Sequence, residues 1–369
     1  MKIPRYQVTY AETPNESGEE IDGILSIRTT YGIEAIKDTF EITCIDKNNS
    51  YNFQMNGRIK IYLYYEGESP VLVMDGLITE VRNEGTEKSN KVKIRGNNIL
   101  EILLNHQTPA DYTEKDVVYM IQNLLQRASD GQPTERRITW NSSNPTKKSD
   151  GSDFPTKNYY STFAPVFQHI EKLSSDEYTE DGQYIFYLDQ SDNTLVWKPR
   201  PTEVYGTIDY GTNTISIKRT KNADEVVNFM IINAGKDLNN ATIHTYAVNP
   251  TSIGKMGWRT KYEVRESLSE FIKNMHPEIT SNSEFRNIVK EFAKAWADRI
   301  LKGFSDGTDK MDILVPGSTG FSAGQLYEIS MPHAGYTKSN RKRLRLMEVE
   351  HNFDKGGWFS QLRFKEELS

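Results

Sequence analysis

Histidine is the side chain best suited to general acid–base catalysis and to metal binding near neutral pH. The chain has six: His106, His169, His244, His276, His333 and His351. No two of them stand in an H-E-x-x-H motif or in a comparable ligand spacing. The single cysteine, Cys44, excludes an intrachain disulfide and a cysteine-based zinc site. We therefore expect scattered structural histidines, no bound metal and no cofactor.

Carboxylates and glycine-rich loops could also carry chemistry. Glycoside hydrolysis needs two facing carboxylates, and Glu177 with Asp181 is one pair among 51 acidic residues, better explained as a solvated loop. The stretch GSTGFSAG (317–324) lacks the Lys and helix start of a phosphate loop and contains no G-x-S-x-G elbow. A connection between strands explains it better. The sequence predicts no catalytic residue, so we expect a protein that is not an enzyme.

Two stretches contain residues typical of contact surfaces. The basic run KSNRKRLR (338–345) includes Arg341, Lys342 and Arg343. It could meet an acidic partner, but protection of an exposed strand edge explains it equally well. The stretch GKMGWRTKY (254–262) places Trp258 beside Arg259, a pair that often anchors interfaces, although a core tryptophan is an equal alternative.

Charge and hydropathy exclude several classes of partner. The net charge of −6 argues against tight binding to nucleic-acid phosphates. The start MKIPRYQVTY has no apolar stretch of signal-peptide length, and no run approaches 18 apolar residues. We expect no export signal and no membrane binding.

The elements that would position these residues begin with strands. FEITC (40–44), RIKIYLYY (58–65) and KVKIR (91–95) alternate apolar and polar side chains, which predicts half-buried antiparallel strands in an all-β domain over 1–105. Helical spacing follows over 113–128, opened by a Thr–x–x–Asp cap, and again over 162–175 with Phe163 on its apolar stripe. A hairpin around DQSDN (189–193) completes a small α+β middle domain over 106–204.

A long helix is predicted after residue 280. Ser281–x–x–Glu284 forms a capping box, and Gly303 is the expected stop. Its apolar stripe contains Phe285, Ile288, Val289, Phe292, Trp296 and Ile300.

The chain also repeats itself in order. SIRTTYGIEAIKDTFEIT (26–43) resembles SIKRTKNADEVVNFMIIN (216–233). Each copy continues with a strand led by Gly57 or Gly324, a strand containing Met74 or Met347, and a final strand after a glycine turn at Gly85 or Gly356. Such self-similarity predicts a duplicated β-barrel or sandwich of four to six strands. The second copy would span 205–235 and 310–369, with 236–309 as a helix-containing insertion.

Two similar barrels in one chain predict a ring. Head-to-tail contacts between successive barrels close when the rotation per barrel is right. Three chains would present six barrels, although two or four chains would also close.

The chain resembles the tail hub (baseplate hub) proteins of contractile-tailed phages and related injection machines, including the late-control protein D group. The resemblance rests on the succession of IRTTYGIEAIKDTFEITC, VLVMDGLITEVRNEG with KVKIRGNNILEIL, IEKLSSDEYTEDGQYIFYLDQSDNTLVWKPRP and LRLMEVEHNFDKGGWFSQLRFKE. It implies a β-rich α+β fold with two tail-tube-like barrels. It also implies a homotrimer whose pseudo-hexameric ring joins the sixfold tail tube to the threefold central spike.

The same resemblance implies the partners. They are the tail tube or a tube-initiator ring, the central spike, baseplate wedge proteins and the tape-measure protein, with the genome passing through the lumen without specific binding. The location would be the virion tail or baseplate, assembled in the host cytoplasm. The chain stops at Ser369 after the second barrel, so a lysozyme, peptidase or spike module would reside on another protein. Two other functions stay open, a cell-wall hydrolase and a host-glycan binding module at the tail tip.

Overall fold

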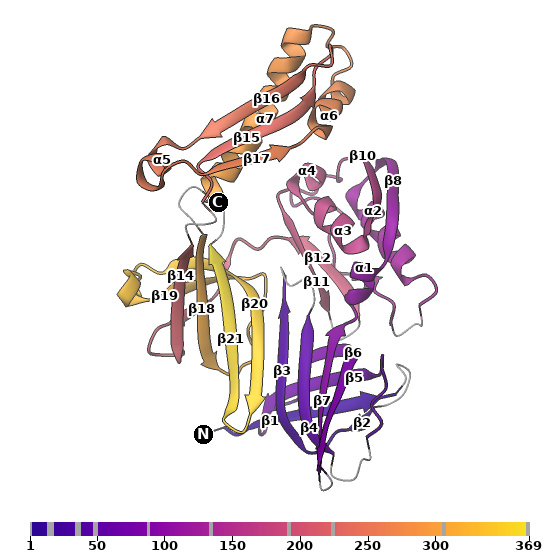
Figure 1. Ribbon diagram of the computed structural model, residues 1–369, viewed down its shortest axis with the longest axis vertical. Helices are drawn as coiled ribbons and strands as arrows, with labels where there is room; N and C mark the ends of the chain where they lie inside the picture. Colours follow the sequence, from indigo (N-terminus) through magenta and orange to yellow (C-terminus); the bar gives the residue numbers. More distant parts are fainter. Residues whose placement is uncertain are drawn as a thin grey trace. The chain divides into compact units, whose positions relative to one another are not determined.

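The computed structural model describes residues 2–12, 18–33, 38–46, 51–86, 89–132, 136–189, 193–222, 226–304 and 308–366. The chain divides into two compact units. Unit 1 contains Met1–Ile217 and Asp312–Phe364, and unit 2 contains Lys218–Met311 and Lys365–Ser369. The fold class is β-rich α+β, as expected: most elements are strands in antiparallel sheets (Figure 1).

The N-terminal β domain of unit 1 is a sheet in the order β3-β4-β7-β6-β5-β1-β2. Its strands are β1 (Pro4–Ala11), β2 (Glu19–Glu20), β3 (Ile24–Gly32), β4 (Thr39–Asp46), β5 (Arg58–Tyr65), β6 (Val71–Thr86) and β7 (Ser89–Asn98). The alternation predicted for β4, β5 and β7 is confirmed, because one side chain in two enters a shared core. Phe40, Ile42 and Cys44 of β4, for example, are all buried there.

The C-terminal β domain contains β13 (Val204–Asp209), β14 (Ser216–Asn222), β18 (Thr308–Pro316), β19 (Leu326–Ser330), β20 (Lys342–Asp354) and β21 (Gly357–Glu366). The 3-10 helix η2 (Pro332–Ala334) follows β19. The strand order is β14-β18-β21-β20, with β19 and then β13 beside β20. This order matches β3-β4-β7-β6-β5-β1, element for element. One pair differs in direction, since β1 pairs antiparallel with β5 whereas β13 pairs parallel with β19.

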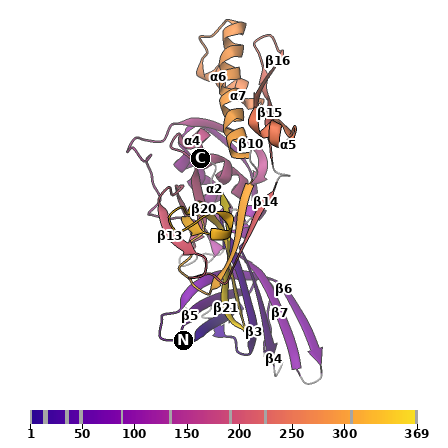
Figure 2. The same cartoon turned by 90° about the vertical axis from the view of Figure 1, so that its left-hand side faces the viewer.

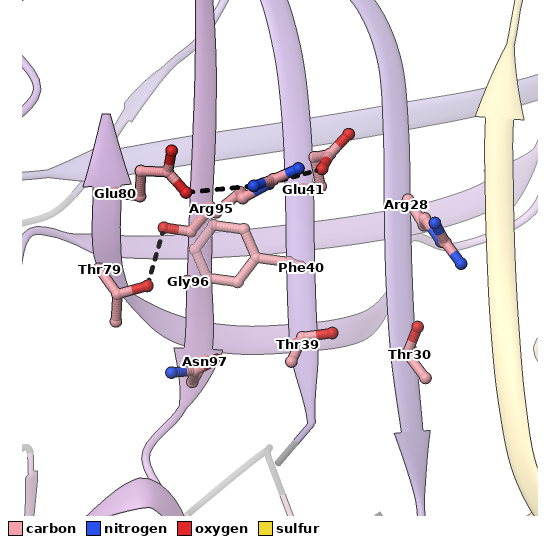
Figure 3. Close-up of a pocket in the computed structure, with 10 residues that line it drawn as sticks. All are labelled: Arg28, Thr30, Thr39, Phe40, Glu41, Thr79, Glu80, Arg95, Gly96 and Asn97. Carbon is pink, nitrogen blue, oxygen red and sulfur yellow. Dashed lines mark hydrogen bonds and ion pairs between the residues drawn. The ribbon is translucent and has the colours of Figure 1, made fainter. Parts of the chain in front are cut away.

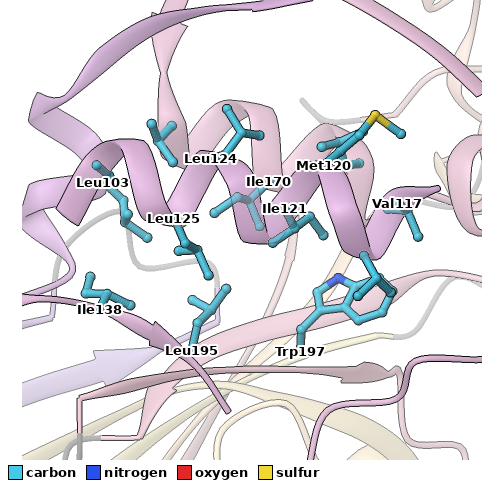
Figure 4. Close-up of a cluster of buried hydrophobic side chains, with 14 of the residues drawn as sticks. Leu103, Val117, Met120, Ile121, Leu124, Leu125, Ile138, Ile170, Leu195 and Trp197 are labelled. Carbon is cyan, nitrogen blue, oxygen red and sulfur yellow. The ribbon is translucent and has the colours of Figure 1, made fainter. Parts of the chain in front are cut away.

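A middle α+β domain lies between them in the sequence. Its elements are α1 (Glu101–Asn105), β8 (Gln107–Lys115), α2 (Val117–Ser129), β9 (Thr139–Trp140), β10 (Lys157–Pro165), α3 (Val166–Leu173), α4 (Asp176–Thr179), β11 (Tyr184–Asp189) and β12 (Thr194–Pro199). The buried face of α2 packs above Leu195 and Trp197 of β12 (Figure 4). This domain therefore has its own core.

Both predicted helix starts in the middle domain were too early. Residues 113–115 belong to β8, which pairs with β10, so α2 begins at Val117 with Asp116 as its cap. Phe163 lies in β10 and is 72% exposed instead of joining the stripe of α3. Pairing between β8 and β10 has overridden the helical spacing at both places.

Unit 2 is a three-stranded sheet with helices packed against it. Its elements are β15 (Phe229–Lys236), β16 (Thr242–Val248), α5 (Pro250–Met256), β17 (Thr260–Val264), α6 (Ser267–Met275) and α7 (Asn282–Phe304). The prediction that residues 229–235 belong to the second barrel is wrong. β15 pairs with β16 and β17 instead, so both of its neighbouring strands belong to unit 2. The strand that corresponds to β4 is β18.

The long helix α7 is confirmed, with Ser281 at its start accepting a hydrogen bond from the Glu284 N–H at 3.5 Å. It continues to Phe304, beyond the expected stop at Gly303. Its buried stripe differs from the predicted one. Phe285, Val289, Ala293, Ala297 and Leu301 are buried, whereas Phe292 is 51% exposed and Trp296 lies partly buried under the Arg265 guanidinium. Small alanines lie against the sheet because they allow close approach.

Candidate functional site: the junction of the two β domains

Two turns show how closely the β domains correspond. In Gln54–Gly57 and in Ser322–Gln325, the fourth residue donates its N–H to the carbonyl of the first, at 3.0 and 3.4 Å. The third residue has positive φ in both, 65° at Asn56 and 83° at Gly324, as a type II turn requires. A tyrosine hydroxyl accepts the N–H of the first residue in each, from Tyr10 and from Tyr327.

The main chain of each turn also hydrogen-bonds to one residue of a long strand, β6 in the first domain and β20 in the second. Ile78 of β6 exchanges hydrogen bonds with Asn56 and Gly57, and Leu346 of β20 exchanges them with Gly324 and Gln325. Ile78 therefore corresponds to Leu346. Two pairings from the sequence were wrong: Gly324 corresponds to Asn56 and not to Gly57, and Met347 corresponds to Thr79 and not to Met74. Residue identity misled there because the main-chain bonds, and not the side-chain types, repeat.

Two arginines repeat in the same frame. Arg95 of β7 donates to Glu80 of β6, and Arg363 of β21 donates to Glu348 of β20. Glu80 and Glu348 both lie two residues after the equivalent Ile78 and Leu346. The two β domains thus share strand order, one turn and one ion pair.

The two domains are joined along strand edges. β20 pairs antiparallel with β3, from Glu348 opposite Gly32 to Phe353 opposite Ile27. Figure 1 shows the two strands side by side, so that a single sheet runs through both domains. Main-chain hydrogen bonds of this kind depend little on residue type, so the residue types of β3 and β20 carry no direct signal of the pairing.

Side chains reinforce the strand pair. The Arg28 guanidinium donates to the Glu350 carboxylate at 2.8 Å. Burial alone would raise the pKa of Glu350, but hydrogen bonds from Arg28 and Asn352 outweigh it and hold that pKa below its usual value. Behind this pair, the Tyr31 hydroxyl lies 3.3 Å from His351 Nε2, and His351 Nδ1 lies 2.8 Å from Ser360 Oγ. Burial lowers the pKa of His351 to about 4, so this histidine is neutral at pH 7.

An apolar contact crosses the junction as well. Trp358 of β21 is buried among the core side chains of the N-terminal β domain. Its ring lies 5.2 Å from that of Tyr65, whose hydroxyl donates to the Gly317 carbonyl at 2.9 Å. A Cβ at Gly317 would lie 2.1 Å from the indole, so only glycine fits there. The two domains share this part of their core.

The face of the joined sheet opposite the core is charged and paired. Glu41 of β4 binds both Lys93 and Arg95 of β7 at 2.7 Å, and Arg95 reaches Glu80. The hollow in Figure 3 is lined by Glu41, Glu80 and Arg95 together with Arg28, Thr30, Thr39, Phe40, Thr79, Gly96 and Asn97. Cross-strand ion pairs of this type leave little uncompensated charge on this face of the sheet.

The structure separates the residues predicted to contact partners. Trp258 and Arg259 lie in unit 2, where Trp258 is 66% exposed with its ring 5.3 Å from that of Phe229. Arg341 lies in unit 1 and binds Asp209 through two bonds of 3.0 Å, which hold the pKa of Asp209 at about 2. The Lys342 ammonium lies over the Tyr336 ring, and Arg343 binds Glu328 at 3.1 Å. The three basic residues thus have acidic or aromatic neighbours in their own chain.

Asp181, one of the two carboxylates considered for glycoside hydrolysis, makes structural hydrogen bonds. The Asp181 carboxylate accepts hydrogen bonds from the Ser149 N–H and the Tyr184 hydroxyl, and so fixes a loop. GSTGFSAG connects β18 with β19, as expected. Within the described ranges, no three His, Cys, Asp or Glu side chains are grouped to hold a metal ion, and no helix is long and apolar enough to cross a membrane.

Comparison with solved structures addresses the fold. The tail protein from Neisseria meningitidis MC58 superposes with a TM-score of 0.66 at 13% identity, covering 98% of this chain and 97% of that one. The 43 kDa tail protein of prophage MuSo2 from Shewanella oneidensis gives 0.66 at 12% identity, covering 98% of both chains. The fold is that of phage tail proteins.

The tail-protein fold extends to secretion machinery. The c3393 protein of E. coli, a type VI secretion component with structural similarity to the T4 bacteriophage tail proteins gp27 and gp5, gives a TM-score of 0.51 at 9% identity, covering 93% of this chain and 73% of that one. No protein-family model and no curated protein sequence matches the chain. The resemblance noted from the sequence is therefore confirmed at the level of the fold.

Proposed function

We propose that this chain is the structural hub of a phage-like tail or baseplate. Three copies would form a ring of six β domains, each a tube-like barrel, that adapts the sixfold tail tube to the threefold central spike. The observation that carries this proposal is the repeated strand order of the two β domains within a tail-protein fold. A duplicated domain lets an odd number of chains present an even number of equivalent faces.

The proposed partners follow from this geometry. The tail tube or its initiator ring would meet the sixfold face, and the spike would meet the threefold face. Wedge and tape-measure proteins would bind at the periphery and in the lumen. The paired charges around Glu41 and Arg95 support a wall that the genome passes without specific binding, in a virion assembled in the host cytoplasm. Trp258 and Arg259 are proposed partner contacts, since Trp258 is largely exposed.

Arg341, Lys342 and Arg343 are weaker proposed contacts. Each would have to exchange a neighbour in its own chain for a partner. The proposal assigns no catalytic step to the chain.

Light scattering on the purified chain tests the proposal. A trimer, together with hub density in imaged tails, is the expected result. A chain that stays monomeric at high concentration and is absent from tails would contradict it. Peptidoglycan hydrolysis by the chain, or binding to a glycan array, would instead support one of the two other functions left open by the sequence.

A further inference from the structure

The two β domains use one strand edge differently. On β20, residues 342–345 pair with β19 and residues 348–353 pair with β3, on the edge opposite β21. On the equivalent β6, residues 71–77 pair with β5. Beyond Ile78, no strand in the described part of the chain pairs with that edge of β6. The edge is open where β20 holds β3.

The strand equivalent to β3 also has an edge without a partner among the described strands. β3 has two neighbours in the sheet, β4 and β20, whereas the equivalent β14 has only β18 among the described strands. Among its described strands, each chain therefore carries one edge of each type that has no partner strand. Their counterparts, β20 and β3, fit each other within the chain.

We propose that β6 of one copy, through Glu80–Gly85, pairs antiparallel with β14 of the next copy. The occupant is a second copy of this chain, because the β20–β3 pair already shows that these two edge types are complementary. Addition of a strand to an open edge supplies main-chain hydrogen bonds without requiring a new pocket. The contact is head-to-tail and would continue the internal junction around the ring. It rests on the proposed hub function, which requires a contact between successive chains.

The internal junction also gives the register. Since Ile78 corresponds to Leu346, Glu84 corresponds to Asn352. β14 lies beside β18 as β3 lies beside β4, and aligning SIKRT (216–220) of β14 with SIRTT (26–30) of β3 makes Lys218 the counterpart of Arg28, both of which are exposed. Asn352 lies opposite Arg28 in the β20–β3 pair. Glu84 of one copy therefore lies opposite Lys218 of the next copy.

The side chains agree with this register. Glu84 and Lys218 are both exposed. They carry opposite charges, which favour each other when directly opposite on paired strands. Exposed charges along an open edge also discourage pairing with unrelated strands. The edge is thus selective for its proposed partner.

Proximity cross-linking tests the register. The full chain carrying Glu84→Cys and Lys218→Cys is treated with a short bis-maleimide and analysed by denaturing electrophoresis. The only native cysteine, Cys44, is buried and is common to all variants. The matched control carries Arg28→Cys and Asn352→Cys, the equivalent positions of the internal junction, and should link within one chain. The two single variants, Glu84→Cys and Lys218→Cys, should give no covalent trimer.

The expected result is covalent dimer and trimer from the Glu84/Lys218 pair and a linked monomer from the control. A trimer by light scattering without cross-linking at Glu84 and Lys218, while the control links, would overturn the edge pairing but leave the hub function standing. A monomer without any intermolecular link would overturn both. A linked monomer from the Glu84/Lys218 pair would also overturn the edge pairing, because it would place the two edges within one chain.

Discussion

The Phe40 ring of the N-terminal β domain packs against two glycines, Gly76 and Gly96. The Phe40 ring lies over the positions where Gly76 and Gly96 lack side chains. A Cβ at Gly96 would lie 2.1 Å from the Leu77 carbonyl oxygen and 2.3 Å from Phe40 Cζ. Either the ring or the strand would have to move.

We predict that Gly96→Ala lowers the free energy of unfolding by about 1–3 kcal/mol, the usual cost of overpacking. Gly85→Ala is the matched control on the neighbouring strand, because its Cβ would meet only the Asn90 side chain, at 3.4 Å. It should change the free energy by less than about 0.5 kcal/mol. Urea denaturation of both variants measures the difference, and equal values would contradict the clash.

Two buried titratable groups predict opposite pH dependences. Burial raises the pKa of Asp38 to about 7, while its carboxylate accepts hydrogen bonds from the Gly32 N–H and the Asn98 amide. The folded state therefore holds a proton that the unfolded state loses, and stability falls as pH rises from about 4 to 7. For His351, burial lowers the pKa to about 4. The unfolded state binds the extra proton, so stability rises between about pH 4 and 6.5.

Because the two effects oppose each other, single variants should reveal them. Relative to the parent chain, Asp38→Asn should gain stability with rising pH, with a slope of up to about 1.4 kcal/mol per pH unit. His351→Gln should show the reverse trend below about pH 6.5. Chemical denaturation at several pH values provides the measurement. Parallel curves for all three proteins would mean that these groups do not titrate as described.

At the scale of elements, α2 begins abruptly where β8 ends. The Asp116 side chain accepts the Tyr119 N–H at 2.8 Å and so stops the strand from running on into the helix. We predict that Asp116→Ala costs about 0.5–2 kcal/mol of stability, as for other N-caps. Asp111→Ala, at an exposed position of β8, serves as the control and should stay within about 0.5 kcal/mol. Thermal unfolding compares them, and equal losses would contradict the cap.

Local pattern predicted elements better than it predicted their partners. The alternation of Phe40, Ile42 and Cys44 identified β4 correctly, because a half-buried strand imposes period two wherever it lies. FMIIN (229–233) shows the same period in β15, yet β15 belongs to unit 2. Period two reports burial of one face and contains no information on which strand lies alongside. The sequence could therefore predict the β-rich class, but not the boundary of the insertion.

The junction was harder to predict than the fold. Arg28 and Glu350 are common surface residue types, and nothing in their spacing indicates that they pair. From the sequence, Trp358 is expected to be a core residue of the C-terminal β domain, but it packs in the core of the N-terminal β domain. Trp258 was recognised as a contact candidate from its neighbour Arg259, but its exposure became known only from the structure.

Unit 2 has a hydrophobic core of its own. Phe285, Val289 and Ala293 of α7 pack with Met230 and Ile232 of β15. We predict that Phe285→Ala destabilises unit 2 by about 3–5 kcal/mol and leaves the β domains unchanged. Phe292→Ala on the same helix, at an exposed position, is the control.

Hydrogen exchange followed by mass spectrometry reads the two units separately. Faster exchange confined to residues 229–301 is the expected result for Phe285→Ala, and none is expected for Phe292→Ala. Exchange that accelerates equally in β3 and β20 would mean that the two units unfold together.

The strand pair between β3 and β20 has a consequence for synthesis. Arg28 and Glu350 are separated by 322 positions, so a ribosome adding about 5–20 residues per second needs roughly 15 to 60 s between making one and the other. During that interval the nascent N-terminal β domain has no β20 to cover its β3 edge. The β3 edge can be covered only once β20 has been synthesised, so until then a nascent chain exposes the β3 edge in addition to the edges proposed to pair between copies.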